Sequence, residues 1–117
     1  MSIQEYFAGK EVLITGATGL VGKVLLEKLL HDLPEIPRVY VLIRKKVSRS
    51  GRTTSPQDRL QREILESSAF DRLRRIHGDS FSALVRDKVE AVPGDLSEEH
   101  LGLDDPTRRR LQERVQV

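Results

Sequence analysis

The turn that decides the fold reads Thr15-Gly16-Ala17-Thr18-Gly19-Leu20-Val21-Gly22. Residues 11–15, which lead into it, are mostly apolar, as in a strand buried on both faces of a parallel sheet. Residues 20–33, which follow it, carry apolar side chains at helical spacing, and this pattern predicts one broad buried stripe. The members of that stripe are Val21, Val24, Leu25, Leu29 and Leu33. The turn therefore joins a buried strand to an amphipathic helix.

The three glycines of this turn have G-x-x-G-x-x-G spacing, a variant of the dinucleotide-binding fingerprint. Gly16 allows a sharp turn off the strand, Gly19 lets the backbone approach a pyrophosphate, and Gly22 lets the helix pack closely on the sheet. The helix N-terminus offers N–H groups and positive dipole to phosphates. We therefore predict that the turn binds a dinucleotide, and a purely structural glycine turn is the alternative.

The rest of the chain alternates between strand and helix patterns. Helices are expected over residues 3–8, from 56 through 65, and over 69–76, 81–85 and 106–113. Strands are expected over residues 39–43 and 88–92, with the start of a fourth at 115–117 and a polar loop over 45–55. Such alternation predicts an α/β fold, the first half of a Rossmann-like parallel sheet with flanking helices. We expect the strands in the spatial order 3-2-1, joined by right-handed crossovers.

The composition is that of one globular domain, since 38% of the 117 residues are hydrophobic and 32% are charged. No apolar run reaches the ~18 residues of a membrane-spanning helix, and no secretory signal is visible, so we expect a cytoplasmic protein. The absence of cysteine excludes disulfides and thiolate metal sites, and the scattered histidines predict no metal site. Basic residues cluster at 44–52, 72–75 and 108–110, but no aromatic residues interleave them, so no nucleic-acid partner is expected.

The end of the second strand normally selects the cofactor. A carboxylate there binds the ribose 2′-hydroxyl of NAD, whereas an arginine accommodates the 2′-phosphate of NADP. This chain offers Arg44 and Lys45 and no acid. Asp95 and Leu96 follow the third strand at the same edge, where Asp95 is expected to face the adenine; a turn-forming or helix-capping role is the alternative. The predicted cofactor-binding residues are Thr15, Gly16, Thr18, Gly19, Leu20, Val21, Gly22, Arg44, Lys45, Asp95 and Leu96.

Five segments in this order resemble the N-terminal half of fatty acyl-CoA reductases, which are extended short-chain dehydrogenases/reductases. They are residues 15–30, Tyr40 to Arg44, Phe70 to Arg74, Gly94 to Leu96, and Leu101 to Leu103. The resemblance implies that the complete chain uses NADPH to reduce a long-chain fatty acyl-CoA to an aldehyde or alcohol. The thioester-reductase domains of carboxylic acid reductases and peptide synthetases are the alternative family, which matches the third and fifth segments less well.

The same resemblance implies a catalytic Tyr-x-x-x-Lys pair after the fourth strand, hence beyond Val117. We therefore expect residues 1–117 to form an NADP-binding portion that ends before the catalytic residues and contains none of them. Tyr6 and Lys10 have the required spacing but precede the first strand. Two other functions stay open: a non-catalytic module that senses NADP(H), and binding of nucleic acid or a membrane surface through the basic loop. The oligomeric state is not indicated.

Overall fold

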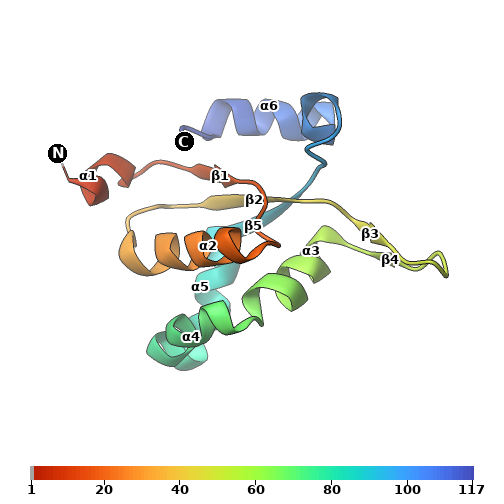
Figure 1. Ribbon diagram of the computed structural model, residues 1–117. Coiled ribbons are helices and arrows are strands. Elements are labelled where there is room, and N and C mark those ends of the chain that lie inside the picture. The colour runs from red at the N-terminus through yellow and green to blue at the C-terminus, as the bar shows by residue number, and fades with distance from the viewer. Residues whose placement is uncertain (1) are drawn as a thin grey trace.

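The computed structural model describes residues 2–117 and is built on a three-stranded parallel sheet (Figure 1). Its strands are β1 (Val12–Ile14), β2 (Val39–Ile43) and β5 (Val89–Pro93), in the order β1-β2-β5. Val12 pairs with Val39, and Val39 pairs with Val89 on its other side. The predicted 3-2-1 order of a Rossmann-like sheet is therefore confirmed.

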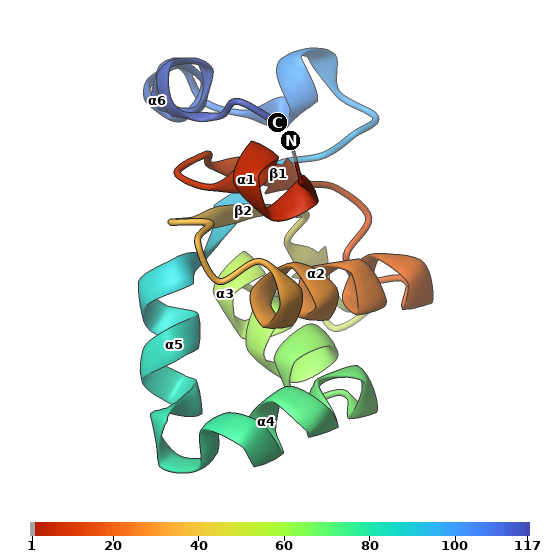
Figure 2. The same ribbon diagram turned by 90° about the vertical axis from the view of Figure 1, so that its left-hand side faces the viewer.

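Helices cover both faces of the sheet, so the molecule has three layers (Figures 1 and 2). One face carries α2 (Leu20–Asp32), α3 (Pro56–Arg59), α4 (Asp71–His77) and α5 (Phe81–Lys88), and the other carries α6 (Asp105–Arg114). A π-helical segment, Leu60–Leu65, continues α3, and short 3-10 turns occupy Ser68–Phe70, Gly78–Ser80 and Glu99–Gly102. The N-terminal helix α1 (Ile3–Phe7) begins at Ser2, whose side chain accepts a hydrogen bond from the Glu5 N–H.

The central strand β2 explains why its sequence is a continuous apolar run. All five of its residues are buried, because helices lie on both sides of it. Val39, Val41 and Ile43 belong to the larger core cluster, which includes side chains of α2, while Tyr40 and Leu42 pack with Leu111 of α6. Alternate side chains of one strand thus hold the two helical layers together.

The start of a fourth strand is also confirmed. Val115 forms a parallel bridge with Glu11, next to β1. The Gln116 N–H donates to the Glu11 carbonyl at 3.0 Å, and the Leu13 N–H donates to the Val117 carbonyl at 3.1 Å. These bonds extend the sheet beyond β1, on the side away from β2.

The predicted loop over residues 45–55 is wrong in part, because it contains a small antiparallel hairpin of β3 (Lys46–Val47) and β4 (Thr53–Thr54). Strands of two residues are too short to show a periodic pattern. The helix expected over residues 106–113 begins one residue earlier, at Asp105. Asp104, not Asp105, accepts a hydrogen bond from the Thr107 N–H at 2.8 Å, since Pro106 lies in the first turn.

The buried stripe predicted for α2 is wrong in its first half. Val21, Val24 and Leu25 are exposed, whereas Leu26 and Leu30 are buried together with Leu29 and Leu33. The helix therefore faces the sheet with the side that carries residues 26, 29, 30 and 33. Helical spacing alone does not choose between these overlapping faces, because apolar residues occupy both.

A buried ion pair links α2 to α4. Glu27 is only 5% exposed, and its two carboxylate oxygens accept hydrogen bonds from Arg72 at 3.2 and 3.1 Å. Burying a carboxylate is unfavourable unless a donor compensates for the lost water. Because Arg72 does so through two parallel bonds, the pair fixes the relative position of the two helices.

Candidate cofactor-binding site

The backbone of the glycine turn requires glycine at two positions. Gly16 has a φ of +73°, in the left-handed region that other residues rarely adopt. A Cβ on Gly22 would lie 2.3 Å from the Gly16 carbonyl oxygen and 2.6 Å from the Ala17 Cα. The first turn of α2 therefore lies directly against the turn that leaves β1.

The N-terminus of α2 has the form of an anion-binding site. Gly19 is the N-cap residue and has no side chain to bond the first-turn N–H groups. Leu20 and Val21 are 76% and 81% exposed, so the backbone here is open to solvent. A Cβ on Gly19 would meet the Gly16 carbonyl oxygen at 3.5 Å, an ordinary contact, so packing does not require this glycine. The approach of a phosphate to the Gly19 backbone stays a prediction, and packing does not account for this glycine.

A cavity of about 190 Å³ lies beside this turn, at the carboxyl ends of the strands. It is lined by Gly16, Ala17, Thr18, Leu42, Ile43, Arg44, Arg59, Gly94, Asp95 and Leu96. The structure thus brings together five predicted residues: Gly16, Thr18, Arg44, Asp95 and Leu96. In an open parallel sheet, ligands bind at this end of the strands.

Six predicted residues do not line the cavity. Thr15, Gly19, Leu20, Val21 and Gly22 continue the turn and the first turn of α2 beside it. Lys45 is exposed, between β2 and β3. The phosphate-binding backbone and the cavity are therefore adjacent parts of one surface.

Charges of opposite sign face each other across the cavity. Arg44 Nη1 lies 4.0 Å from Asp95 Oδ2, and the Arg44 side chain is 69% exposed. The other carboxylate oxygen of Asp95 accepts bonds from the Ser97 N–H at 2.9 Å and from its hydroxyl at 2.7 Å. These bonds, and then the charge of Arg44, hold the Asp95 pKa below its usual value. Asp95 therefore makes a turn and keeps a negative charge toward Arg44, while its contact with adenine stays a prediction.

The loop after β5 is folded tightly enough to hold Asp95 in place. The Asp95 N–H donates to the Leu101 carbonyl at 2.7 Å, and Gly102 has a φ of +65°. A Cβ on Gly94 would lie 2.3 Å from a methyl group of Leu42 and 2.7 Å from the Leu101 carbonyl oxygen. These contacts explain physically why two of the five family-like segments, Gly94 to Leu96 and Leu101 to Leu103, lie together.

Sequence reasoning missed Arg59, which comes from the end of α3 and reaches the cavity. Its Nη1 donates to the Arg44 carbonyl at 2.5 Å, and its Nε and Nη2 donate to Glu63 at 2.7 and 3.2 Å. The i, i+4 spacing of Arg59 and Glu63 was a visible signal of their pairing. The contact with Arg44 depends on tertiary structure and had no signal.

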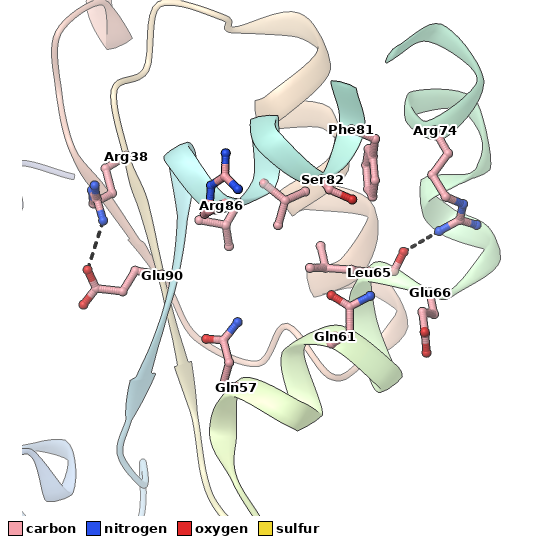
Figure 3. Close-up of a pocket in the computed structure, with 12 residues that line it drawn as sticks. Arg38, Gln57, Gln61, Leu65, Glu66, Arg74, Phe81, Ser82, Arg86 and Glu90 are labelled. Carbon is pink, nitrogen blue, oxygen red and sulfur yellow. Dashed lines mark hydrogen bonds and ion pairs between the residues drawn. The ribbon is translucent and has the colours of Figure 1, made fainter. Parts of the chain in front are cut away.

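A larger cavity, of about 760 Å³, lies at the opposite ends of the strands (Figure 3). Arg38, just before β2, donates to Glu90 of β5 at 3.1 Å, and the side chains of Gln57 and Gln61 line the same cavity. Arg74 at its far side is bonded to the Leu65 carbonyl. The glycine turn and Arg44 are not among its lining residues, so volume alone does not identify the cofactor site.

The candidate Tyr-x-x-x-Lys pair near the N-terminus lies elsewhere in the molecule. The Lys10 ammonium lies 3.4 Å from the centroid of the Tyr6 ring, a cation–π contact. Neither residue lines the cavity beside the glycine turn. Among residues 2–117, no cluster of acids and histidines could hold a metal ion. Within the same range, no helix combines the length and apolar character needed to span a bilayer.

Residues 14–117 match a family of NAD-binding domains described as "Male sterility protein". This match covers the glycine turn, the whole sheet apart from the first residues of β1, and α6. The chain belongs to this family. Membership agrees with the turn and the strand order, which are the features that a nicotinamide dinucleotide requires.

Proteins named fatty acyl-CoA reductase are among the relatives of this chain. The chain is 47% identical to fatty acyl-CoA reductase 1 of Mus musculus over 105 residues, which is 90% of this chain and 18% of the mouse protein. It is 39% identical to fatty acyl-CoA reductase 1 of Arabidopsis thaliana, over 86% of this chain and 20% of that protein. The chain therefore spans about a fifth of the length of these relatives.

Solved structures with the same arrangement are reductase domains. The reductase domain of a non-ribosomal peptide synthetase from Mycobacterium tuberculosis has a TM-score of 0.66 and 37% identity, over 92% of this chain and 23% of that one. The terminal reductase domain of the myxalamid biosynthetic pathway has a TM-score of 0.62 and 28% identity. Both agree with the Rossmann-like fold.

Proposed function

We propose that this chain is the NADPH-binding part of a reductase that acts on long-chain fatty acyl-CoA. The observation that carries the proposal is the convergence of the glycine turn, Arg44 and Asp95 on one cavity at the carboxyl ends of the strands. The relatives named as fatty acyl-CoA reductases support the substrate class. The catalytic residues of such a reductase are expected outside residues 1–117.

Each part of the site has a separate task in this proposal. The backbone from Gly16 to Gly22 and the N-terminus of α2 would hold the pyrophosphate. Arg44 would bind the ribose 2′-phosphate, to which its guanidinium can donate two parallel bonds. The bound nicotinamide supplies a hydride. The Asp95 loop would form the wall against the adenosine.

The preference for NADPH follows from charge. A 2′-phosphate carries nearly two negative charges, and a hydrogen bond between charged groups contributes ~1.5–3 kcal/mol. The exposure of Arg44 reduces this value, because water competes for the same groups. We expect NADPH to bind roughly 10- to 100-fold more tightly than NADH, equivalent to ~1.4–2.7 kcal/mol.

The test is a titration of NADPH and NADH against the protein purified at its natural length, at fixed salt. Arg44→Ala should remove most of the preference and leave NADH binding nearly unchanged. Arg49→Ala is the matched control, because Arg49 is an exposed arginine in the turn of the β3–β4 hairpin and does not line the cavity. Equal affinities for both cofactors in the wild type would contradict the proposal.

The second candidate is reduction of an acyl thioester held on a carrier protein. It is favoured by the similarity to reductase domains of peptide synthetases. Oxidation of NADPH, followed by absorbance, separates the two substrates. A rate that depends on long-chain acyl-CoA supports the first proposal, and a rate seen only with carrier-bound thioester supports the second.

A further inference from the structure

We infer that Arg59 is a positioning residue that sets cofactor preference by holding the backbone of Arg44. This inference rests on the proposed function, in which Arg44 binds the 2′-phosphate. Arg59 would act through Arg44 and need not touch the cofactor.

Each of the three guanidinium nitrogens of Arg59 donates a hydrogen bond. Nη1 donates to the carbonyl oxygen of Arg44, while Nε and Nη2 grip both carboxylate oxygens of Glu63. A lysine has one nitrogen at the end of a flexible stem and cannot copy this planar fork. The Arg59 side chain is only 12% exposed, compared with 69% for Arg44. Arg59, whose side chain is largely buried, therefore holds the main chain of Arg44, whose side chain is largely exposed.

The carbonyl that Arg59 binds lies at a gap in the backbone pairing. β2 ends at Ile43 and β3 begins at Lys46, so Arg44 belongs to neither ladder. The hairpin of β3 and β4 projects from this point (Figure 1). The bond from Arg59 therefore adds a hold on the main chain of this segment to those given by the strand before it and the hairpin after it.

Glu63 in turn lies on a helical segment that packs into the core. It lies in the π-helical segment, where Leu60, Ile64 and Leu65 are buried in the core. The bond from Arg59 keeps the Glu63 pKa below its usual value, so the carboxylate is charged at neutral pH. The Arg44 backbone is thus connected to the core through the hydrogen bonds of Arg59 with Glu63. Local π-helical turns are frequently found at functional sites.

Loss of the bond from Arg59 to the Arg44 carbonyl should weaken the binding of NADPH but not that of NADH. Moving the Arg44 backbone weakens contact with the 2′-phosphate, which only NADPH carries. The pyrophosphate would be held by the separate turn from Gly16 to Gly22, so NADH binding should not change. A purely structural role for Arg59 would instead weaken both cofactors alike.

The experiment compares Arg59→Lys with Arg62→Lys in the protein at its natural length, by titration of NADPH and NADH. The Arg62 side chain is exposed on the same helical segment and makes none of the side-chain hydrogen bonds or ion pairs found within residues 2–117, so it is a matched control. Arg59→Lys should raise the NADPH dissociation constant and lower the preference about tenfold, because it loses charge-assisted bonds. The NADH constant should stay within about twofold of wild type, and Arg62→Lys should change neither.

A double variant tests whether Arg59 acts through Arg44. In an Arg44→Ala background, Arg59→Lys should have no further effect on the preference, because coupled residues are not additive. A further loss in that background would show direct contact with the cofactor and overturn the inference. If Arg59→Lys does not fold, Glu63→Gln takes its place in the experiment. This variant keeps the bond from Arg59 to the Arg44 carbonyl but removes the charged acceptor that fixes the guanidinium. It should therefore reduce the NADPH preference by less than Arg59→Lys does.

The outcomes distinguish the two proposals. An unchanged preference in Arg59→Lys or Glu63→Gln, with the Arg44→Ala loss still present, overturns the positioning role alone. Equally weakened binding of NADPH and NADH in these variants also overturns the positioning role. A wild type without NADPH preference contradicts the proposed function and the inference together.

Discussion

Replacement of Gly22 by alanine should destabilise the fold by a predictable amount. The added Cβ would lie 2.3 Å from the Gly16 carbonyl oxygen, where ordinary contact begins at 3.4 Å. All three of its nearest atoms belong to the backbone, so no side chain can rotate away. The first turn of α2 must therefore move by about 1 Å. Overpacking of this kind costs ~1–3 kcal/mol.

The assay is urea unfolding, followed by circular dichroism, with Gly19→Ala as the matched control. A Cβ on Gly19 would make only an ordinary 3.5 Å contact, and its φ of −82° suits alanine. Gly19→Ala should therefore keep its stability within ~0.5 kcal/mol but lose affinity for NADPH, since the methyl group lies where the pyrophosphate should approach. Equal stability of Gly22→Ala and wild type would refute the packing argument, and unchanged cofactor binding in Gly19→Ala would refute the phosphate argument.

Two further predictions concern stability. Glu27→Gln should lower the free energy of unfolding by ~1–3 kcal/mol. This is less than the usual cost of breaking a fully buried ion pair, because the Arg72 side chain is 45% exposed. An unchanged chemical denaturation curve would show that the pair does not contribute to stability. Asp104→Ala should lower the urea midpoint more than Asp105→Ala, because only Asp104 caps α6. Hydrogen bonds from the Thr107 side chain and N–H lower the pKa of Asp104 in the folded protein. The stabilisation that the Asp104 carboxylate contributes is therefore fully present above its pKa in the unfolded chain, near 3.9, and is lost as the pH falls through its lower pKa in the folded protein. The Asp104→Asn variant can still cap α6 but has no carboxyl group to titrate. The difference in free energy of unfolding between this variant and wild type should therefore become smaller as the pH falls.

The sheet and the glycine turn could be predicted because each depends on local pattern. The run from Val39 to Ile43 is apolar throughout because helices cover it on both sides. The turn could be recognised because its backbone has a positive φ at Gly16, a conformation that glycine adopts readily and other residues rarely do. The strand order 3-2-1 then followed from the arrangement of strands in the first half of a Rossmann-like sheet.

The features that escaped prediction depend on tertiary contacts or on very short elements. The bond between Arg59 and the Arg44 carbonyl joins residues whose meeting has no periodic signal. The buried face of α2 was misjudged because Val21 and Leu25 are as apolar as Leu26 and Leu30. The pairing of Glu27 with Arg72 also has no local signature, since a glutamate in a helix is normally exposed.

The parallel topology of the sheet has a consequence for how the protein folds. Val12 pairs with Val39 and Val39 with Val89, so no strand pair of the sheet can form as a local hairpin. Pairing between distant segments slows folding, because loop-closure entropy is lost before the contacts form. The β3–β4 hairpin and the helices are local and can form within microseconds. We therefore expect the cavity, which gathers the ends of distant segments, to be completed in the slowest phase of refolding.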